Sequence, residues 1–256
     1  MTVRIGIAGI TGRMGRLLAE EVPAMGAVLA GGVRRPGGAD APDLPLMPNL
    51  EALASHSDVL IDFTHASTAT CHGAVLAEAG VGWVLGTSGL DEAAEAAVAD
   101  AAAKIPVLCA ANFAPGVNLM MVLAERMAAA LPAAGYDVEI LEMHHRQKVD
   151  APSGTAIGLG RAVAQGRGTA LETVMQGGRH GNVGARRTGE IGFATLRGGQ
   201  VVGEHTVLFA GASEHLALVH RAFDRRVYAT GAVSGALWLA GRLPGLYTMR
   251  DVLGMR

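Results

Sequence analysis

The chain has 256 residues, of which 50% are hydrophobic and 17% charged, with a formal net charge of −2 at neutral pH. This balance, with only 4% aromatic residues, argues against a nucleic-acid partner, which needs a basic or stacking surface. Glycine is abundant at 36 residues, but aliphatic and charged residues are interspersed and no Gly-X-Y period exists, so we expect a folded protein.

In the first 110 residues, short aliphatic runs alternate with helical stretches. Predicted strands cover 3–8, 27–33, 59–61, 82–85 and 107–108, and predicted helices cover 13–22, 67–79 and 91–103. Short runs that are apolar on both faces and alternate with helices are typical of a parallel sheet covered on both sides. The Pro- and Gly-rich segment 31–49 predicts a long loop, and a short helix at 50–54 stays open.

After Pro115 and Gly116 the pattern changes. A helix is predicted over 117–131, an alternating strand over 136–144 and a helix beginning near Ser153. A Gly- and Arg-rich stretch, 166–189, then precedes strand-like runs at 191–196, 201–209 and 215–220. Strands that follow strands indicate a mixed or antiparallel sheet in an α+β domain. The last predicted helix, 227–240, is apolar nearly all round and should be buried against the first domain.

Neither a membrane span nor an export signal is predicted. The first apolar run, 3–10, is too short to cross a membrane and lacks the charged lead and cleavage site of a signal peptide. Cys71 and Cys109 are far apart and form no CxxC motif, which fits a reducing, cytoplasmic compartment. We expect both cysteines to be small core residues.

The first predicted strand runs into a GxxGxxG turn, with glycines at positions 9, 12 and 15, that feeds a helix. Such a turn lets the backbone approach a pyrophosphate, which then lies over the amides at the positive end of the helix. The spacing differs from the GxGxxG fingerprint, and a purely structural tight turn is the alternative. Dinucleotide binding is the favoured interpretation.

Arg34 and Arg35 follow the second predicted strand, where NAD-selective sites place an acidic residue on the ribose. Two guanidinium groups suit a 2′-phosphate better than a bare hydroxyl, so the pair favours NADPH without excluding NADH. Two solvated arginines are the alternative. Two further loops end strands on the same rim and are placed to line a nicotinamide, or are ordinary turns: Gly86, Thr87, Ser88, Gly89 and Ala110, Ala111, Asn112, Phe113.

The densest chemistry lies between 142 and 155. If the strand persists to His145, His144 and His145 point to opposite faces, which is poor geometry for a shared metal, so no metal site is predicted. Lys148 lies four residues after His144, and both cationic groups can converge on one anionic substrate. Solvated surface charge is the alternative.

The segment that follows this loop can bind an anion. Ser153 is a good helix N-cap, and the amides of Gly154 and Thr155 would face outward toward a carboxylate. Gly154 has no side chain to obstruct a ligand.

Together these motifs resemble the 4-hydroxy-tetrahydrodipicolinate reductase (dihydrodipicolinate reductase) family over essentially the whole chain. The most specific motif is HHRQKVDAPSGT, from His144 to Thr155, beside the glycine turn GITGRMG. Supporting motifs are IDFT at 61–64, GTSG at 86–89, ANF at 111–113, GEIGFATLRGG at 189–199 and VVGEHTVLFA at 201–210.

The resemblance implies a cytosolic homotetramer that reduces a small cyclic dicarboxylate with NADPH or NADH, on the diaminopimelate route to lysine. It implies that His144 and Lys148 move the proton and that His145 and the turn Ser153, Gly154, Thr155 bind substrate carboxylates. It implies cofactor contacts from Gly9, Ile10, Thr11, Gly12, Arg13, Met14, Gly86, Thr87, Ser88, Ala110, Ala111, Asn112 and Phe113. Many family members have an acidic residue where this chain has Arg34, which again favours NADPH.

We therefore expect an α/β fold with two domains. The first, 1–114 completed by 224–256, is a Rossmann-like dinucleotide-binding domain with a parallel sheet. The second, 115–223, is an α+β substrate-binding and tetramerisation domain with a mixed sheet. The linker near Pro115 and Gly116 suggests that one domain closes on the other.

The sequence leaves two alternative functions and the role of one loop open. Another two-domain NAD(P) dehydrogenase would need a different catalytic set, and a non-catalytic dinucleotide-binding redox sensor would not need His144 and Lys148. The Arg/Gly-rich loop has no assigned role: a solvated loop is favoured for Arg179, His180, Arg186 and Arg187, and a substrate or subunit flap is the alternative.

Overall fold

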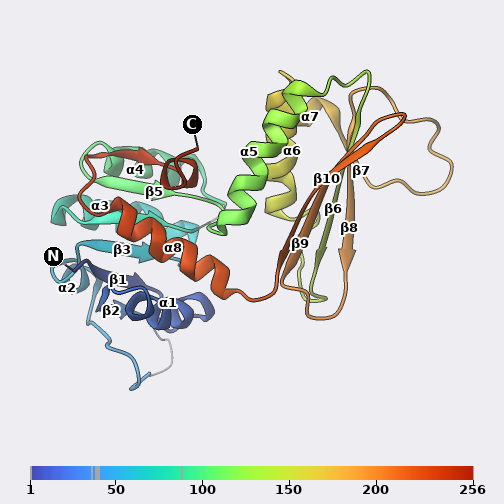
Figure 1. Ribbon diagram of the computed structural model, residues 1–256. Helices are drawn as coiled ribbons and strands as arrows, with labels where there is room; N and C mark the ends of the chain where they lie inside the picture. Colours follow the sequence, from blue (N-terminus) through green and yellow to red (C-terminus); the bar gives the residue numbers. More distant parts are fainter. Residues whose placement is uncertain (1, 36, 38–40, 88, 256) are drawn as a thin grey trace. The chain divides into compact units, whose positions relative to one another are not determined.

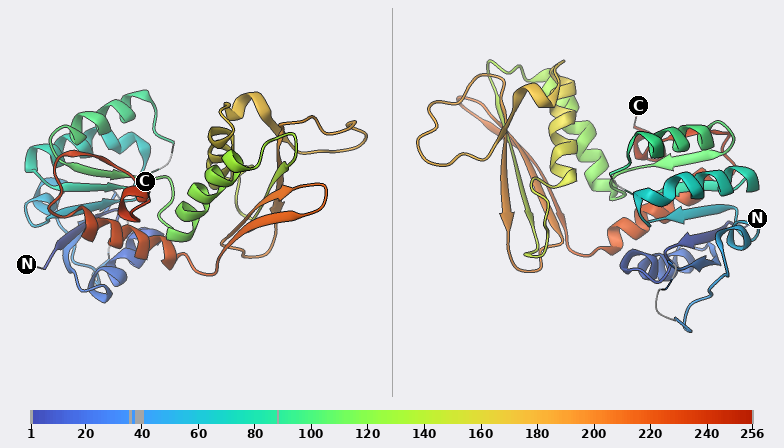
Figure 2. Two further views of the ribbon diagram at one scale, coloured as in Figure 1. Left: turned by 45° about the horizontal axis from the view of Figure 1, so that its top comes forward. Right: turned by 180° about the vertical axis from the view of Figure 1, so that it is seen from behind.

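The structure, a computed structural model, describes residues 2–35, 37, 41–87 and 89–255. The chain forms two compact units, drawn in Figures 1 and 2. Unit 1 comprises Met1–Pro115 and Arg226–Arg256, and unit 2 comprises Gly116–Arg225.

Unit 1 is built on a six-stranded sheet with the strand order β11-β5-β4-β3-β1-β2, in which every pairing is parallel (Figure 1). The strands are β1 (Arg4–Ala8), β2 (Val28–Val33), β3 (Val59–Asp62), β4 (Gly82–Leu85), β5 (Pro106–Cys109) and β11 (Gly245–Tyr247). Because parallel strands end at one edge of the sheet, the loops after β1, β2, β3, β4 and β5 gather on that edge.

Helices cover both faces of this sheet (Figure 2). Ile5 and Ile61 face a core shared with α1 and α8, whereas Leu60 and Trp83 face a core shared with α2, α3 and α4. The strands are therefore apolar on both sides, as the sequence predicts. The helices are α1 (Arg13–Ala24), α2 (Leu50–Ala54), η1 (Ala66–Thr68), α3 (Ala69–Ala79), α4 (Glu92–Ala102), α8 (Arg226–Leu239) and α9 (Met249–Val252).

Unit 2 contains a mixed sheet with the order β10-β9-β6-β8-β7. Strand β6 pairs antiparallel with β9 and parallel with β8, and α5 and α6 pack on one face of the sheet over Ile140, Phe193 and Val207 (Figures 1 and 2). The elements are α5 (Pro115–Ala130), β6 (Asp137–His144), α6 (Gly154–Gly166), α7 (Leu171–Val174), β7 (Met175–Gly177), β8 (Ile191–Arg197), β9 (Gly203–Ala210) and β10 (His215–Ala222).

The predicted fold class is confirmed, with a parallel sheet in one unit and a mixed sheet in the other. The prediction that the helix at 227–240 is buried is also confirmed, because α8 packs in the core of unit 1. The short helix at 50–54 exists as α2, and strand β6 ends at His144 rather than His145.

Two sequence expectations are wrong. Cys71 is exposed, because it lies on the solvent side of α3, while Cys109 is half-buried. The prediction that Arg186 lies in a solvated loop is also wrong. Its side chain is 18% exposed and bonds to Asp137, Glu139 and the carbonyls of Val138 and Glu190. Arg179 donates to both carboxylate oxygens of the same Glu139, so these two arginines fasten the loop to β6.

Candidate active site

A buried carboxylate organises the end of β6 in unit 2. Glu142 and His144 are two residues apart on the strand and therefore share its inner side. They are 1% and 8% exposed, and His144 Nδ1 lies 2.6 Å from Glu142 Oε2. Because an ionised carboxylate only accepts, Nδ1 donates, and Nε2 is left as the second nitrogen of the ring.

Arg197 and Ser153 occupy the remaining positions around this carboxylate. Arg197 pairs with His144 in the β6–β8 register, and its two terminal nitrogens lie 2.8 Å from the two Glu142 oxygens, a bidentate contact. The Ser153 amide donates to Glu142 Oε1 at 3.0 Å. The carboxylate therefore has partners on both oxygens.

The loop between His144 and Ser153 is held by polar contacts. Lys148 Nζ lies 2.9 Å from Asp150 Oδ1, and the Lys148 amide donates to the carbonyl of His145. Arg197 also donates to the carbonyl of Asp150 at 2.6 Å. His145 is half-buried, and its buried Nδ1 has no hydrogen-bond partner among the described residues.

Ser153 caps α6 with its side chain and is almost fully buried. Its Oγ accepts from the amide of Ala156 at 3.1 Å and lies 3.1 Å from Nε2 of His205. Both its amide and its hydroxyl are thus bonded within the protein. Gly154, the first residue of α6, is open: a Cβ built there meets no atom within 4 Å. The first-turn amides of a helix have no acceptor within that helix, so they can bind an anion.

Burial and charge set the protonation of this cluster. Burial, together with the positive charges of Lys148 and Arg197, lowers the pKa of His144 against the opposing effect of Glu142, so His144 is neutral at neutral pH. Burial tends to raise the pKa of Glu142, but hydrogen bonds from Arg197, His144 and Ser153 hold it below its usual value. The hydrogen bond from Lys148 lowers the pKa of Asp150.

His205 lies beside His144 with its ring edge-on, at a centroid distance of 5.1 Å. Burial is the main cause that lowers the pKa of His205 to about 4. Sequence reasoning assigned no role to Glu142, Arg197 or His205. Each of the three residues occupies an inward position on its strand: Glu142 on β6, Arg197 on β8 and His205 on β9. The alternating sequence pattern could have indicated these positions, but nothing in the sequence shows that the strands are neighbours.

In unit 1, the glycine turn is tightly folded against β2. Gly9 has φ +78°, and the amides of Gly9 and Ile10 both donate to the carbonyl of Val33. A Cβ at Gly15 would lie 2.2 Å from the Gly9 carbonyl oxygen, so only glycine fits there. Helix α1 begins after Gly12 without a side-chain cap or an acidic residue in its first turn. The turn therefore fits a pyrophosphate at the helix start.

The other predicted cofactor residues lie along the same edge of the sheet. Arg34 lines a hollow of about 610 Å³ after β2, together with Met47, Asn49 and His72. Arg35 is exposed. His72 Nδ1 lies 2.7 Å from the buried carboxylate of Asp62.

The two rim loops differ in what they expose. Thr87 is 8% exposed, and its Oγ1 has no hydrogen-bond partner among the described residues, while Ser88 lies outside them. Asn112 Oδ1 accepts from the amide of Ala114, and Ala110 donates its amide to Leu85. The side chains of Ile10 and Phe113 are buried in the core of unit 1. Thr11, Arg13, Met14 and Ala111 are half-buried or exposed.

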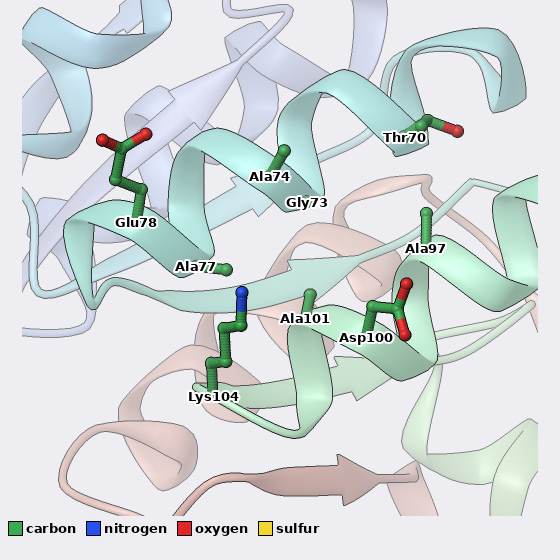
Figure 3. A pocket seen from close by; sticks show the side chains of 9 residues that line it. All are labelled: Thr70, Gly73, Ala74, Ala77, Glu78, Ala97, Asp100, Ala101 and Lys104. Atoms are coloured by element: carbon green, nitrogen blue, oxygen red, sulfur yellow. The ribbon is translucent and has the colours of Figure 1, made fainter.

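Another hollow of about 480 Å³ lies between α3 and α4 in unit 1 (Figure 3). Alanine and glycine form its floor, and Glu78, Asp100 and Lys104 are the charged side chains around it. None of the predicted site residues lines it. Within the described ranges, no three His, Cys, Asp or Glu side chains gather as metal ligands, and no helix there is long and apolar enough to cross a membrane.

The parallel sheet with its glycine turn and the separate unit with a His, Lys and carboxylate cluster define a nicotinamide-dinucleotide oxidoreductase. The comparisons agree. Residues 3–113 match the family model described as "Dihydrodipicolinate reductase, N-terminus", and residues 116–253 match "Dihydrodipicolinate reductase, C-terminus". The chain belongs to the dihydrodipicolinate reductase family.

Individual relatives support the same conclusion. The 4-hydroxy-tetrahydrodipicolinate reductases of Granulibacter bethesdensis and Acidiphilium cryptum are 62% and 61% identical, over 100% and 99% of this chain and 98% of each relative. A dipicolinate-bound dihydrodipicolinate reductase from a Paenisporosarcina species has a TM-score of 0.79 at 26% identity, covering 97% of this chain and 98% of that chain. A probable dehydrogenase from Thermotoga maritima, at 9% identity, shares the fold alone (TM-score 0.62; coverage 99% and 93%).

Proposed function

We propose that His144 and Lys148 provide and direct the proton when this chain reduces 4-hydroxy-tetrahydrodipicolinate to tetrahydrodipicolinate, a step on the diaminopimelate route to lysine. The hydride and one proton are consumed, and the 4-hydroxyl group of the substrate leaves as water. The observation that carries the proposal is that His144 and the Ser153 amide, just before α6, both bond to the carboxylate of Glu142, in a chain of this family. Lys148 is near enough for its charge to act on His144, and Gly154 is open to a ligand. Relatives at 60% identity or more bear the name of this reductase.

The substrate carboxylates are proposed to bind at the start of α6 and at His145. Gly154 leaves space for a ligand. The buried Nδ1 of His145, which has no partner in the part of the chain that the structure describes, would gain one from a carboxylate. Thr155 is proposed as a further contact. Because the hydroxyl and amide of Ser153 are already bonded, its contribution is to fix the helix start beneath the carboxylate.

Proton transfer is divided between two groups in this proposal. Lys148 is proposed to donate a proton to the anionic product of reduction. Its charge also adds to the effect of burial, which is the main cause that lowers the pKa of His144. Neutral His144 can relay or accept a proton through Nε2, because Nδ1 is committed to Glu142. General acid–base groups of this kind contribute about 10²–10⁴-fold to a rate.

The nicotinamide cofactor, when bound, supplies a hydride to the substrate ring. We propose that unit 1 is the dinucleotide-binding domain, with the backbone of 9–14 at the pyrophosphate, Gly86, Thr87 and Ser88 in one rim loop and residues 110–113 in the other. The Thr87 hydroxyl, buried and without a partner among the residues that the structure describes, supports a polar ligand there. Unit 2 is proposed as the substrate-binding and tetramerisation domain. We also propose that one unit closes on the other about the boundary at Pro115 and Gly116.

NADPH is proposed as the preferred form of the cofactor, through Arg34 at the hollow after β2 and Arg35 beside it. We expect Arg34→Glu to lower the NADPH to NADH ratio of kcat/KM by roughly 10- to 150-fold, since a hydrogen bond to a charged group contributes about 1.5–3 kcal/mol. Lys104→Glu, at the other hollow of unit 1, is the matched control and should leave the ratio unchanged (Figure 3). An unchanged ratio in Arg34→Glu refutes the phosphate role.

A homotetramer in the cytoplasm is proposed as the working form. Figure 1 shows α5 and α6 on one side of the unit 2 sheet. The side chains of Leu141, Leu196 and Val219, in strands of this sheet, are 40%, 48% and 51% exposed and do not belong to the core that the sheet shares with these helices. Exposed apolar side chains gathered on one face can mark an association surface. The sheet face is therefore a candidate subunit interface.

The activity is tested by following NADPH absorbance while the substrate is generated enzymatically in the cuvette. We expect NADPH oxidation that depends on both the chain and the substrate-generating enzyme. NADPH binding without turnover would favour the non-catalytic redox sensor, and turnover only with an amino acid or a sugar would favour another dehydrogenase.

A further inference from the structure

We infer that Glu142 is the positioning residue of this site, holding the imidazole of His144 and the start of α6 to one buried carboxylate that Arg197 neutralises. The inference rests on the proposed function, since it concerns how His144 is presented to the substrate. Glu142 is 1% exposed, so it cannot itself bind a ligand from solvent.

The first contact fixes the ring. With Oε2 of Glu142 at 2.6 Å, the proton of neutral His144 resides on Nδ1 and Nε2 is the nitrogen available to the substrate. The edge-on ring of His205, 5.1 Å away, packs against His144 and limits its rotation. Orientation and tautomer are thus set by two neighbours.

The second contact fixes the anion site. The other Glu142 oxygen, Oε1, accepts from the amide of Ser153, immediately before Gly154. Both ends of the loop 145–153 are therefore joined to the same carboxylate, and Arg197 holds its middle through the carbonyl of Asp150. A change at Glu142 should disturb the proton-transfer group and the carboxylate cradle together.

A purely structural ion pair between Glu142 and Arg197 is the competing explanation. Removing one partner of a buried pair destabilises a protein whatever its role in chemistry. Activity alone cannot separate the two explanations, so the test needs the tautomer of His144 and the pH dependence of the reaction.

The experiment compares wild type with Glu142→Gln and Glu142→Asp in the full-length chain. Long-range ¹H–¹⁵N spectra, with His144 assigned through His144→Gln, report the protonated ring nitrogen. We expect the Nδ1–H tautomer in wild type, a mixture of tautomers in Glu142→Gln and return of the Nδ1–H form in Glu142→Asp. The limb of the kcat/KM profile that belongs to His144 should move to lower pH in Glu142→Gln, because the carboxylate raises the pKa of His144.

We expect kcat to fall and substrate KM to rise in Glu142→Gln, with kcat/KM lower by about 10- to 100-fold, the loss typical when a carboxylate that orients a histidine is removed. NADPH affinity should stay within twofold of wild type. The matched control is Glu172→Gln, which removes an exposed carboxylate of the same unit and should change none of these values.

An unchanged tautomer and pH limb in Glu142→Gln, with activity lost only in proportion to unfolded protein, would overturn the inference. His144→Ala run in parallel separates this result from failure of the proposed function. Full activity in His144→Ala would remove the catalytic role of His144, whereas the tautomer measurement would still report whether Glu142 fixes its ring.

Discussion

At the scale of single residues, the site is defined by which groups are kept neutral. His144 and His205 are buried with lowered pKa values, while Glu142 stays ionised because Arg197 and His144 donate to it. In the proposed function, neutral His144 at the end of β6 relays or accepts the proton, and Lys148 in the loop that follows donates it. In this arrangement the negatively charged substrate would bind to Lys148 and to the start of α6, because the neutral histidines contribute no positive charge.

His205 links this arrangement to stability. An unfolded histidine takes up a proton near pH 6.5, but folded His205 does so only near pH 4, so the unfolded state binds more protons between these values. Stability conferred by neutral His205 is therefore present above about pH 6.5 and lost as the pH falls toward 4. Between pH 7.5 and pH 5 the loss is about 2 kcal/mol, at 1.36 kcal/mol per pKa unit.

We expect His205→Gln to remove this part of the pH dependence, since an amide can still bond to Ser153 but does not titrate. Denaturant unfolding of wild type, His205→Gln and the exposed control His180→Gln at pH 7.5 and pH 5 measures it. Equal losses of stability in wild type and His205→Gln would contradict the assignment of His205 as a buried neutral group.

At the scale of elements, the start of α6 is the proposed binding site for a substrate carboxylate. We expect Gly154→Ala to raise substrate KM roughly 10- to 150-fold, because a Cβ would stand where a carboxylate gains a charged hydrogen bond of about 1.5–3 kcal/mol. The melting temperature should not fall, since that Cβ meets no protein atom. Gly177→Ala, also open in unit 2, is the control. An unchanged KM would exclude a ligand carboxylate at the start of α6.

The elements also show how far the sequence alone reaches. Strands β1 to β5 and the long helices were predicted within one or two residues of most ends, because these strands contain apolar runs and the helices contain a full hydrophobic period. The short elements α7, β7, β11 and α9, of three or four residues, contain none and were missed. Strand β11 is recognisable only by its pairing with Pro106–Leu108, far away in the chain.

The same limit applies to the site. His144, Lys148 and Ser153 were found because they are near one another in sequence. Glu142 lay within the same segment but received no role, because its partner Arg197 is 55 residues away and becomes its neighbour only through the β6–β8 pairing. Register between strands is set by tertiary packing, which the residue pattern of one strand does not contain.

At the scale of the whole molecule, the two units separate the two tasks that the proposed function requires. One has a parallel sheet with a glycine turn, and the other has a half-covered mixed sheet with the titratable cluster. The uncovered face of the mixed sheet is the proposed subunit interface.

We expect Val219→Asp to dissociate the proposed tetramer, because a charge would be buried in an apolar interface without a partner. Sedimentation velocity at several protein concentrations measures the change. Leu243→Asp, at a residue 78% exposed in unit 1, is the control and should sediment as wild type does. A tetramer that survives Val219→Asp would place the interface elsewhere.

In the proposed function, the chemistry belongs to His144 at the end of β6 and to the loop that follows, whereas cofactor binding belongs to unit 1. The most direct test measures kcat and the Kd for NADPH in His144→Ala. The account predicts a kcat lower by about 10²–10⁴-fold, the usual contribution of a general acid–base group, with Kd within twofold of wild type. A large loss of NADPH affinity with kcat intact would contradict it.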